Sequence, residues 1–102
     1  MDELNINILA IGYNQPIMDV VLRLINSHNY WNGAVALSRE DAVNNLKERE
    51  LDVILLCAGV SPEDEEYFRR TAKTINTDTK VIRHFGGGSG LLESEIRTAL
   101  NK

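Results

Sequence analysis

Cys57 is the residue whose type and position most directly raise the question of chemistry. It stands at the end of the apolar run 52–57 and is followed by a turn and the acidic start of a helix. Reactive groups in open α/β sheets lie at the carboxyl ends of strands, and a cysteine with a lowered pKa could act there as a nucleophile or redox sensor. No basic residue adjoins Cys57 in sequence, and free cysteines are commonly buried as small apolar groups. We interpret Cys57 as a packing residue, with a reactive thiol as the alternative.

A glycine-rich loop at residues 86–90 is the second candidate site. Backbone N–H groups in such a loop can cradle a phosphate when a helix begins directly after it. The loop matches neither the dinucleotide-binding motif nor the P-loop, whose Lys-Ser/Thr pair is absent. A flexible connection between a strand and a helix is the other interpretation, because glycine tolerates many backbone conformations. The loop residues are Gly86, Gly87, Gly88, Ser89 and Gly90.

Four strand-like runs, each followed by a helical pattern, must position these residues. Apolar runs predict strands over residues 6–11, 32–37, 52–57 and 80–85. Pro16 and Pro62 suit the first position of a helix, while Ser38 and Ser61 suit N-caps and are each followed three residues later by aspartate. Apolar residues at helical spacing are expected to face the sheet. They are Ile17, Val20, Val21, Leu24 and Ile25 in the first helix, Tyr67, Phe68, Thr71, Ala72 and Ile75 in the third, and Leu92, Ile96, Ala99 and Leu100 in the last.

Four consecutive strand–helix units predict a parallel sheet with helices on both faces, because right-handed crossovers leave few other topologies. We therefore expect one α/β domain over residues 1–102, a three-layer α/β/α sandwich. The first and third strands are the most continuously apolar, so they should be central. The expected strand order is 2-1-3-4.

Composition narrows the possible functions. With 102 residues, of which 43% are hydrophobic and 25% charged, the chain can form one core. It has no apolar run long enough to span a bilayer and begins without a cationic signal-peptide leader, so we expect a cytoplasmic protein that contacts no membrane. One cysteine excludes an internal disulfide, and no spaced Cys/His set or cofactor motif predicts a metal or a cofactor. A net charge of -4 without a basic cluster argues against nucleic acid as a partner.

Nearly all of the chain resembles a receiver domain of two-component signalling. The run 8–14 is similar to the first receiver strand with its terminal acidic pair, and the run 51–57 is similar to the strand that ends in the phosphoacceptor aspartate. Pro62 and the acidic turn after it resemble the receiver segment that follows the phosphoacceptor strand. Residues 80–82 resemble the fourth receiver strand, and residues 91–100 resemble the closing helix. The resemblance implies a flavodoxin-like fold and a regulatory role.

The chain departs from the receiver pattern at the positions that carry out the family's phosphorylation chemistry. Gly12 and Tyr13 stand where the family has its magnesium-binding acids, and Cys57 stands where it has the phosphoacceptor. Phe85 stands near the expected hydroxyl, and the fifth strand, with its lysine and following proline, has no counterpart. Magnesium needs hard oxygen ligands. The resemblance therefore implies a truncated pseudo-receiver, a non-catalytic signalling module that binds another protein and is not an enzyme.

A missing fifth strand predicts a free sheet edge at the fourth strand. Unpaired N–H and C=O groups on such an edge invite pairing with another chain. We expect this edge to form a weak homodimer or to contact a protein partner, and its residues are Lys80, Ile82, Arg83 and His84. The alternative function is a small phosphate- or nucleotide-binding protein that uses the loop at residues 86–90.

Overall fold

Four parallel strands form one sheet in the order β2-β1-β3-β4. The computed structural model describes residues 6–84 and 89–100, the side chains of residues 89–91 excepted. The strands are β1 (Ile6–Ile11), β2 (Trp31–Ala36), β3 (Val53–Leu56) and β4 (Lys80–Arg83). The helices are α1 (Gln15–Asn26), α2 (Arg39–Glu48), α3 (Pro62–Ile75) and α4 (Ser89–Leu100). The predicted parallel topology and strand order are confirmed.

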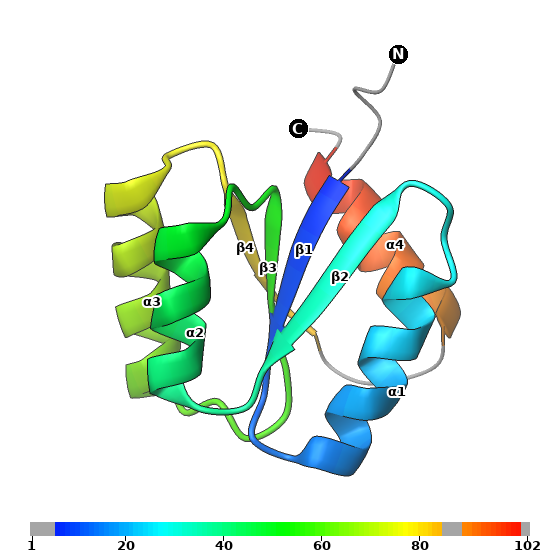
Figure 1. Cartoon of the computed structure of the whole chain (residues 1–102), viewed down its shortest axis with the longest axis horizontal. Coiled ribbons are helices and arrows are strands. Elements are labelled where there is room, and N and C mark those ends of the chain that lie inside the picture. Colours follow the sequence, from blue (N-terminus) through cyan, green and yellow to red (C-terminus); the bar gives the residue numbers. More distant parts are fainter. Residues whose placement is uncertain (1–5, 85–88, 101–102) are drawn as a thin grey trace.

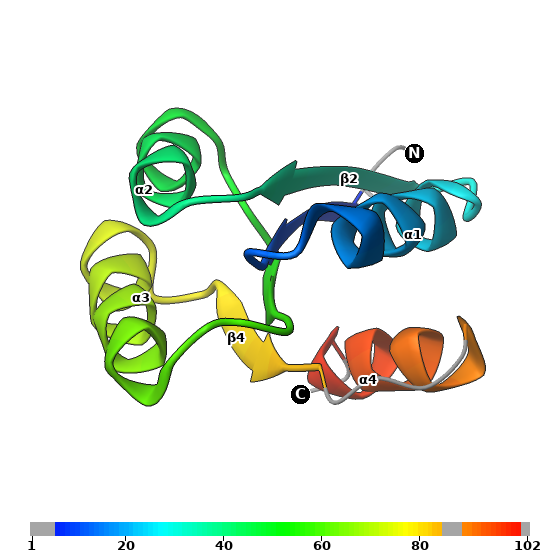
Figure 2. The ribbon, with the colours of Figure 1, turned by 90° about the horizontal axis from the view of Figure 1, so that it is seen from below.

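The helices cover the two faces of the sheet in pairs. Helices α1 and α4 lie on one face, and α2 and α3 lie on the other (Figures 1 and 2). Side chains alternate accordingly along β1, where Ile8 and Ala10 join the α1/α4 core and Leu9 and Ile11 join the α2/α3 core. The three-layer α/β/α sandwich is therefore confirmed.

The helix starts follow from side chains that cap free backbone N–H groups. Ser38 Oγ accepts a hydrogen bond from the Asp41 N–H, and Ser61 Oγ accepts one from the Asp64 N–H, each at 3.1 Å. Both predicted N-caps are thus present. Helix α1 is capped in the same way by Asn14, which the sequence interpretation did not single out.

Two predicted helix faces differ from the observed ones. In α1 the buried residues are Met18, Val21 and Ile25, while Ile17 and Val20 are exposed. The predictions for Val21, Leu24 and Ile25 are confirmed. Those for Ile17 and Val20 are wrong, because the spacing of apolar residues alone did not distinguish the two sides of the stripe. Ile75, predicted to pack inward, is also exposed, since it is the last residue of α3.

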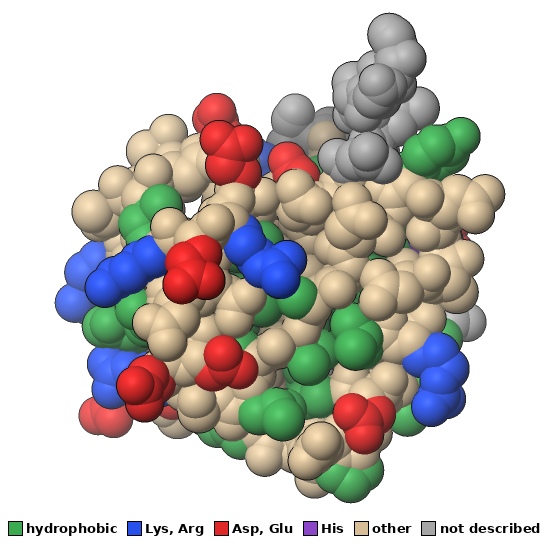
Figure 3. Space-filling view, in the orientation of Figure 1, with side chains coloured by type: hydrophobic (Ala, Val, Ile, Leu, Met, Phe, Trp, Pro, Cys, Tyr) green, Lys and Arg blue, Asp and Glu red, His purple; other side chains and the backbone are tan. Residues whose placement is uncertain are grey.

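The two edges of the sheet are β2 and β4. On the face nearest β2, apolar side chains gather between α1 and α2, with charged side chains around them (Figure 3). Strand β3 lies between β1 and β4, and all four of its residues are completely buried. None of the helices in residues 6–84 and 89–100 combines the length and apolar character needed to cross a membrane.

Candidate functional site

The carboxyl ends of β1 and β3 bring three predicted site residues together. The Cys57 N–H donates to the Ile11 carbonyl at 2.8 Å, and the Tyr13 N–H donates to the Ala58 carbonyl at 3.2 Å. Gly12 lies between these two contacts, so Gly12, Tyr13 and Cys57 are neighbours at one end of the sheet. Phe85, the fourth predicted position, lies outside the described residues.

Gly12 is packed so closely that a larger side chain would require its neighbours to move. A Cβ atom at this position would lie 2.5 Å from Met18 Sδ, 3.1 Å from Cys57 Cβ and 3.2 Å from the Ala58 carbonyl oxygen. Real Cβ atoms essentially never approach another heavy atom to 2.5 Å. The space between the ends of β1 and β3 is therefore filled by Met18 and Cys57.

Cys57 is part of the core on the α1/α4 side of the sheet. Its side chain is 1% exposed, and its Sγ lies 3.9 Å from the Leu55 carbonyl oxygen. Burial, with a smaller contribution from Glu95, raises the pKa of the Cys57 thiol to about 12, although Arg83 acts in the opposite direction. The thiol is thus protonated at neutral pH, which agrees with the packing interpretation.

This end of the sheet does not fit a magnesium ion. Such an ion requires several oxygen ligands in near-octahedral geometry, and Gly12 and Cys57 supply none. An acidic side chain at position 12 would also require Met18 Sδ to move and would press on Cys57 Cβ and the Ala58 carbonyl oxygen. Across the residues that the structure describes, no group of three or more His, Cys, Asp or Glu side chains is arranged to hold a metal ion.

Tyr13 extends over the loop that follows β3 and contacts the start of α3. Its hydroxyl donates to Asp64 Oδ2 at 2.9 Å, and burial together with this bond raises its pKa to about 12. Gly59 has a φ of 95° and lies directly beneath Tyr13, where an added Cβ would be 3.3 Å from the Tyr13 Cβ. Tyr13 thus holds the β3–α3 loop against the end of β1.

Arg39 joins the first turns of α2 and α3. Its Nη1 lies 3.9 Å from Asp64 Oδ1, and its guanidinium carbon lies 3.9 Å from the centre of the Tyr67 ring. The ring quadrupole attracts the cation in this position. Asp64 is therefore engaged by both Tyr13 and Arg39.

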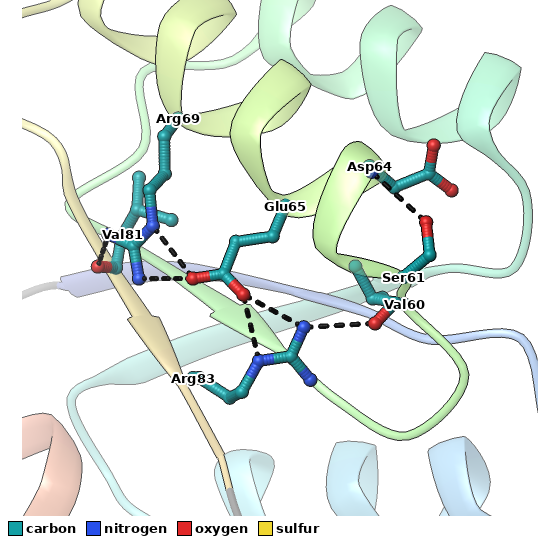
Figure 4. A network of polar contacts seen from close by, with 7 residues as sticks. All are labelled: Val60, Ser61, Asp64, Glu65, Arg69, Val81 and Arg83. Atoms are coloured by element: carbon teal, nitrogen blue, oxygen red, sulfur yellow. Dashed lines mark hydrogen bonds and ion pairs between the residues drawn. The ribbon is translucent and has the colours of Figure 1, made fainter.

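A second polar network links α3 to β4, as Figure 4 shows. Glu65 accepts hydrogen bonds from Arg83 Nε and Arg69 Nε at 3.0 Å each. Arg83 Nη2 also donates to the Val60 carbonyl at 2.9 Å, and Arg69 Nη1 donates to the Val81 carbonyl at 2.8 Å. Hydrogen bonds from Arg83 and Arg69 lower the pKa of the Glu65 carboxyl.

The sequence interpretation missed the role of Glu65. The acids at the start of α3 were noted there only as an acidic turn after Pro62. The pairing of Glu65 with Arg69 could have been read from their spacing of four residues on one helix. The pairing with Arg83 could not, since Arg83 lies 18 residues away on a strand.

The four residues of the predicted interaction edge point in different directions. Arg83 turns toward α3, whereas His84 turns toward α4, where its Nδ1 lies 2.6 Å from Glu95 Oε1. Ile82 packs against the α1/α4 core, and Lys80 is exposed. Of these four residues, therefore, only Lys80 has an exposed side chain.

The predicted anion-binding loop is only partly described. Ser89 and Gly90 are the first two residues of α4 and do not belong to a loop, contrary to the expectation. Gly86, Gly87 and Gly88 lie outside the described residues. The phosphate-binding interpretation therefore stays a prediction.

Comparison with known proteins identifies the fold. No protein-family model matches the chain, and no curated protein matches it significantly. Among solved structures, the chain is similar to the signal receiver domain of an HD domain-containing protein from Pseudomonas fluorescens Pf-5. The two share 14% sequence identity over 95% of each chain, with a TM-score of 0.63. The chain thus has a receiver-like fold, as the sequence predicted.

Proposed function

We propose that the chain is a non-catalytic regulatory module that acts by binding another protein. The close packing of Gly12 against Met18 and Cys57 carries this proposal. In this receiver-like fold the carboxyl ends of β1 and β3 are the expected place for chemistry. Here that place holds a glycine in close contact with Met18 and Cys57, and a buried, protonated thiol.

The polar groups near this end support the same conclusion. Asp64 is bound by Tyr13 and Arg39, and Glu65 is bound by Arg69 and Arg83. These carboxylates hold α3 against its neighbours. With its polar groups used in this way, the module would act through its surface.

The proposal is tested by exposing the protein to phosphorylating conditions. Acetyl phosphate, or beryllofluoride with magnesium, should leave the amide NMR spectrum and the intact mass unchanged, while a receiver domain with an intact aspartate serves as the positive control. Magnesium-dependent shifts at Gly12, Tyr13 and Cys57 would contradict the proposal. A stable phosphorylated species at any residue of this cluster would do so as well.

A further inference from the structure

Strand β4 directs alternate backbone groups to the free edge of the sheet. The N–H groups of Lys80 and His84 donate to carbonyls of β3, namely those of Asp52 and Leu56, at 2.9 Å each. Since neighbouring residues of a strand point their N–H and C=O groups to opposite sides, the groups of Val81 and Arg83 point away from β3. In the described part of the chain no strand pairs with that side of β4.

Two grooves flank this edge, one on each face of the sheet. The groove on the α3 side has a volume of about 380 Å³ and is lined by Arg69, Arg70 and Lys73 together with Val81 at its floor. The groove on the α4 side has a volume of about 360 Å³, and its lining includes Ile82, Thr98 and Ala99.

The two grooves differ in chemistry. The α3-side groove has three cationic side chains and one carboxylate, that of Glu66, on a chain whose net charge is -4. The α4-side groove is apolar at Ile82 and Ala99, and its other lining residues are Ser94, Thr98 and Glu95. The Glu95 carboxylate is held by His84, with 2.6 Å between Oε1 and Nδ1. Successive side chains of any strand added to β4 would enter these two grooves in alternation.

We propose that β4 is a docking site for an extended segment of a partner protein in which apolar and acidic residues alternate. This inference rests on the proposed function and names the partner class. The segment adds a strand through the outward N–H and C=O groups of Val81 and Arg83. Its acidic side chains lie toward Arg69, Arg70 and Lys73, and its apolar side chains lie toward Ile82.

Arg69 occupies the outward carbonyl of Val81 with a hydrogen bond that an incoming acidic strand could replace. Its Nη1 donates to the outward carbonyl of Val81, as Figure 4 shows, so the carbonyl is satisfied while the edge is unoccupied. An incoming N–H replaces that bond, and Arg69 Nη1 then becomes available to a carboxylate of the partner. A segment without acids would displace the bond from Arg69 Nη1 and leave Arg69 only its pairing with Glu65.

A second copy of the chain is a poorer occupant than an acidic segment. Strand β4 has the sequence Lys-Val-Ile-Arg and carries no acidic residue. A second β4 strand added at this edge would therefore bring no carboxylate to the cations Arg69, Arg70 and Lys73 of the α3-side groove. The charge pattern thus favours a different protein over the homodimer.

The probe for this site is an eight-residue labelled peptide of alternating valine and glutamate. A valine–lysine peptide with the same alternation is the charge control, and a peptide with its four valines and four glutamates in two blocks is the pattern control. Fluorescence anisotropy should show saturable binding of the valine–glutamate peptide alone, weakened by salt. Amide NMR shifts should centre on Val81, Ile82 and Arg83.

Two variants separate strand addition from simple charge attraction. Val81→Pro removes an outward N–H and leaves the bonds between β4 and β3 in place, because proline is tolerated on edge strands. It should abolish peptide binding, with Val81→Thr as the control. The double change Arg70→Glu with Lys73→Glu alters exposed side chains only and should weaken binding at least about tenfold. If Val81→Pro does not fold, the double variant alone tests whether the peptide binds at the proposed site.

The proposal is overturned if the valine–glutamate peptide does not bind, if the valine–lysine or block peptide binds equally well, or if folded Val81→Pro or the double variant binds normally. Sedimentation that shows a dimer lost in Val81→Pro would also overturn it in favour of self-association. These failures leave the proposed function intact when beryllofluoride still has no effect. A response to beryllofluoride would instead overturn the proposed function itself.

Discussion

The hydroxyl of Tyr13 donates a hydrogen bond to Asp64 Oδ2 at 2.9 Å and so joins the end of β1 to the first turn of α3. Tyr13, the second residue after β1, is therefore a structural tie between two elements. Asp64 itself is 21% exposed and also pairs with Arg39.

Removal of this hydroxyl should destabilise the fold modestly. Tyr13→Phe keeps the ring over Gly59 and deletes only the bond to Asp64, so the free energy of unfolding should fall by about 1 kcal/mol. Urea denaturation followed by circular dichroism measures the change. Tyr30→Phe is the control, because the Tyr30 side chain is exposed and should change stability by less than about 0.5 kcal/mol. Equal effects of the two substitutions would contradict the structural role of Tyr13.

The Cys57 thiol should be unreactive until the protein unfolds. Its pKa is raised from 9.0 to about 12 in the folded state, so the folded protein holds the proton more tightly than the unfolded chain does. This contribution to stability is complete below pH 9 and is lost as the pH rises toward 12. Ellman's reagent at pH 8 should therefore modify Cys57 only in urea, and the urea midpoint should fall between pH 8.5 and pH 10.5. Rapid modification of the native protein would show that the thiol is accessible.

Enlargement of Gly12 should disturb the packing at the ends of β1 and β3. Gly12→Ala should cost about 1–3 kcal/mol, because the new methyl group meets Met18 Sδ. A shorter side chain at position 18 relieves that contact. Gly12→Ala combined with Met18→Ala should therefore cost less than the sum of the single changes by at least about 0.5 kcal/mol. Strict additivity in urea denaturation would mean that the two residues do not compete for the same space.

The network around Glu65 should make a larger contribution than an exposed ion pair on the same helix. Glu65 and Arg83 are only 26% and 24% exposed, whereas Glu66 and Arg70 are 73% and 69% exposed. Glu65→Gln should lower the free energy of unfolding by about 1–2 kcal/mol at pH 7, and Glu66→Gln by less than about 0.5 kcal/mol.

The effect of Glu65 should also depend on pH. The pKa of Glu65 is lowered in the folded state, so its contribution is present above the pKa of the unfolded chain and is lost as the pH falls through the folded-state pKa. The difference between the native protein and Glu65→Gln should therefore shrink under acidic conditions. A difference that stays constant from pH 7 to the acid limit of the folded state would contradict this assignment.

The fold could be predicted because its signals are local and repeated. Ser38 and Ser61 fix helix starts, and the uninterrupted apolar run in β3 places that strand in the centre of the sheet. The inward face of α1 was predicted correctly at Val21 and Ile25 but not at Ile17 and Val20, which are as apolar as the residues that are buried. Which side chains of α1 are buried depends on how the helix packs on the sheet, and the local sequence pattern does not specify that packing.

The candidate site was less accessible to sequence interpretation. The neighbours of Gly12 are Met18 and Cys57, and only their close approach shows that no side chain fits between them. The bonds of Glu65 to Arg83 and of His84 to Glu95 join different elements, so they depend on tertiary structure. A sequence can place such residues near the end of a strand, but it does not specify which of them meet.

The packing around Gly12 also restricts how this chain could change by mutation. An aspartate introduced at position 12 alone would collide with Met18, and one introduced at position 57 alone would place a carboxylate in the apolar core beside Leu92 and Ile96. Each step would lower stability, and neither alone would assemble a set of magnesium ligands. A mutational path toward aspartyl phosphorylation would therefore cross destabilised intermediates, whereas substitutions on the β4 edge could accumulate one at a time in a folded protein.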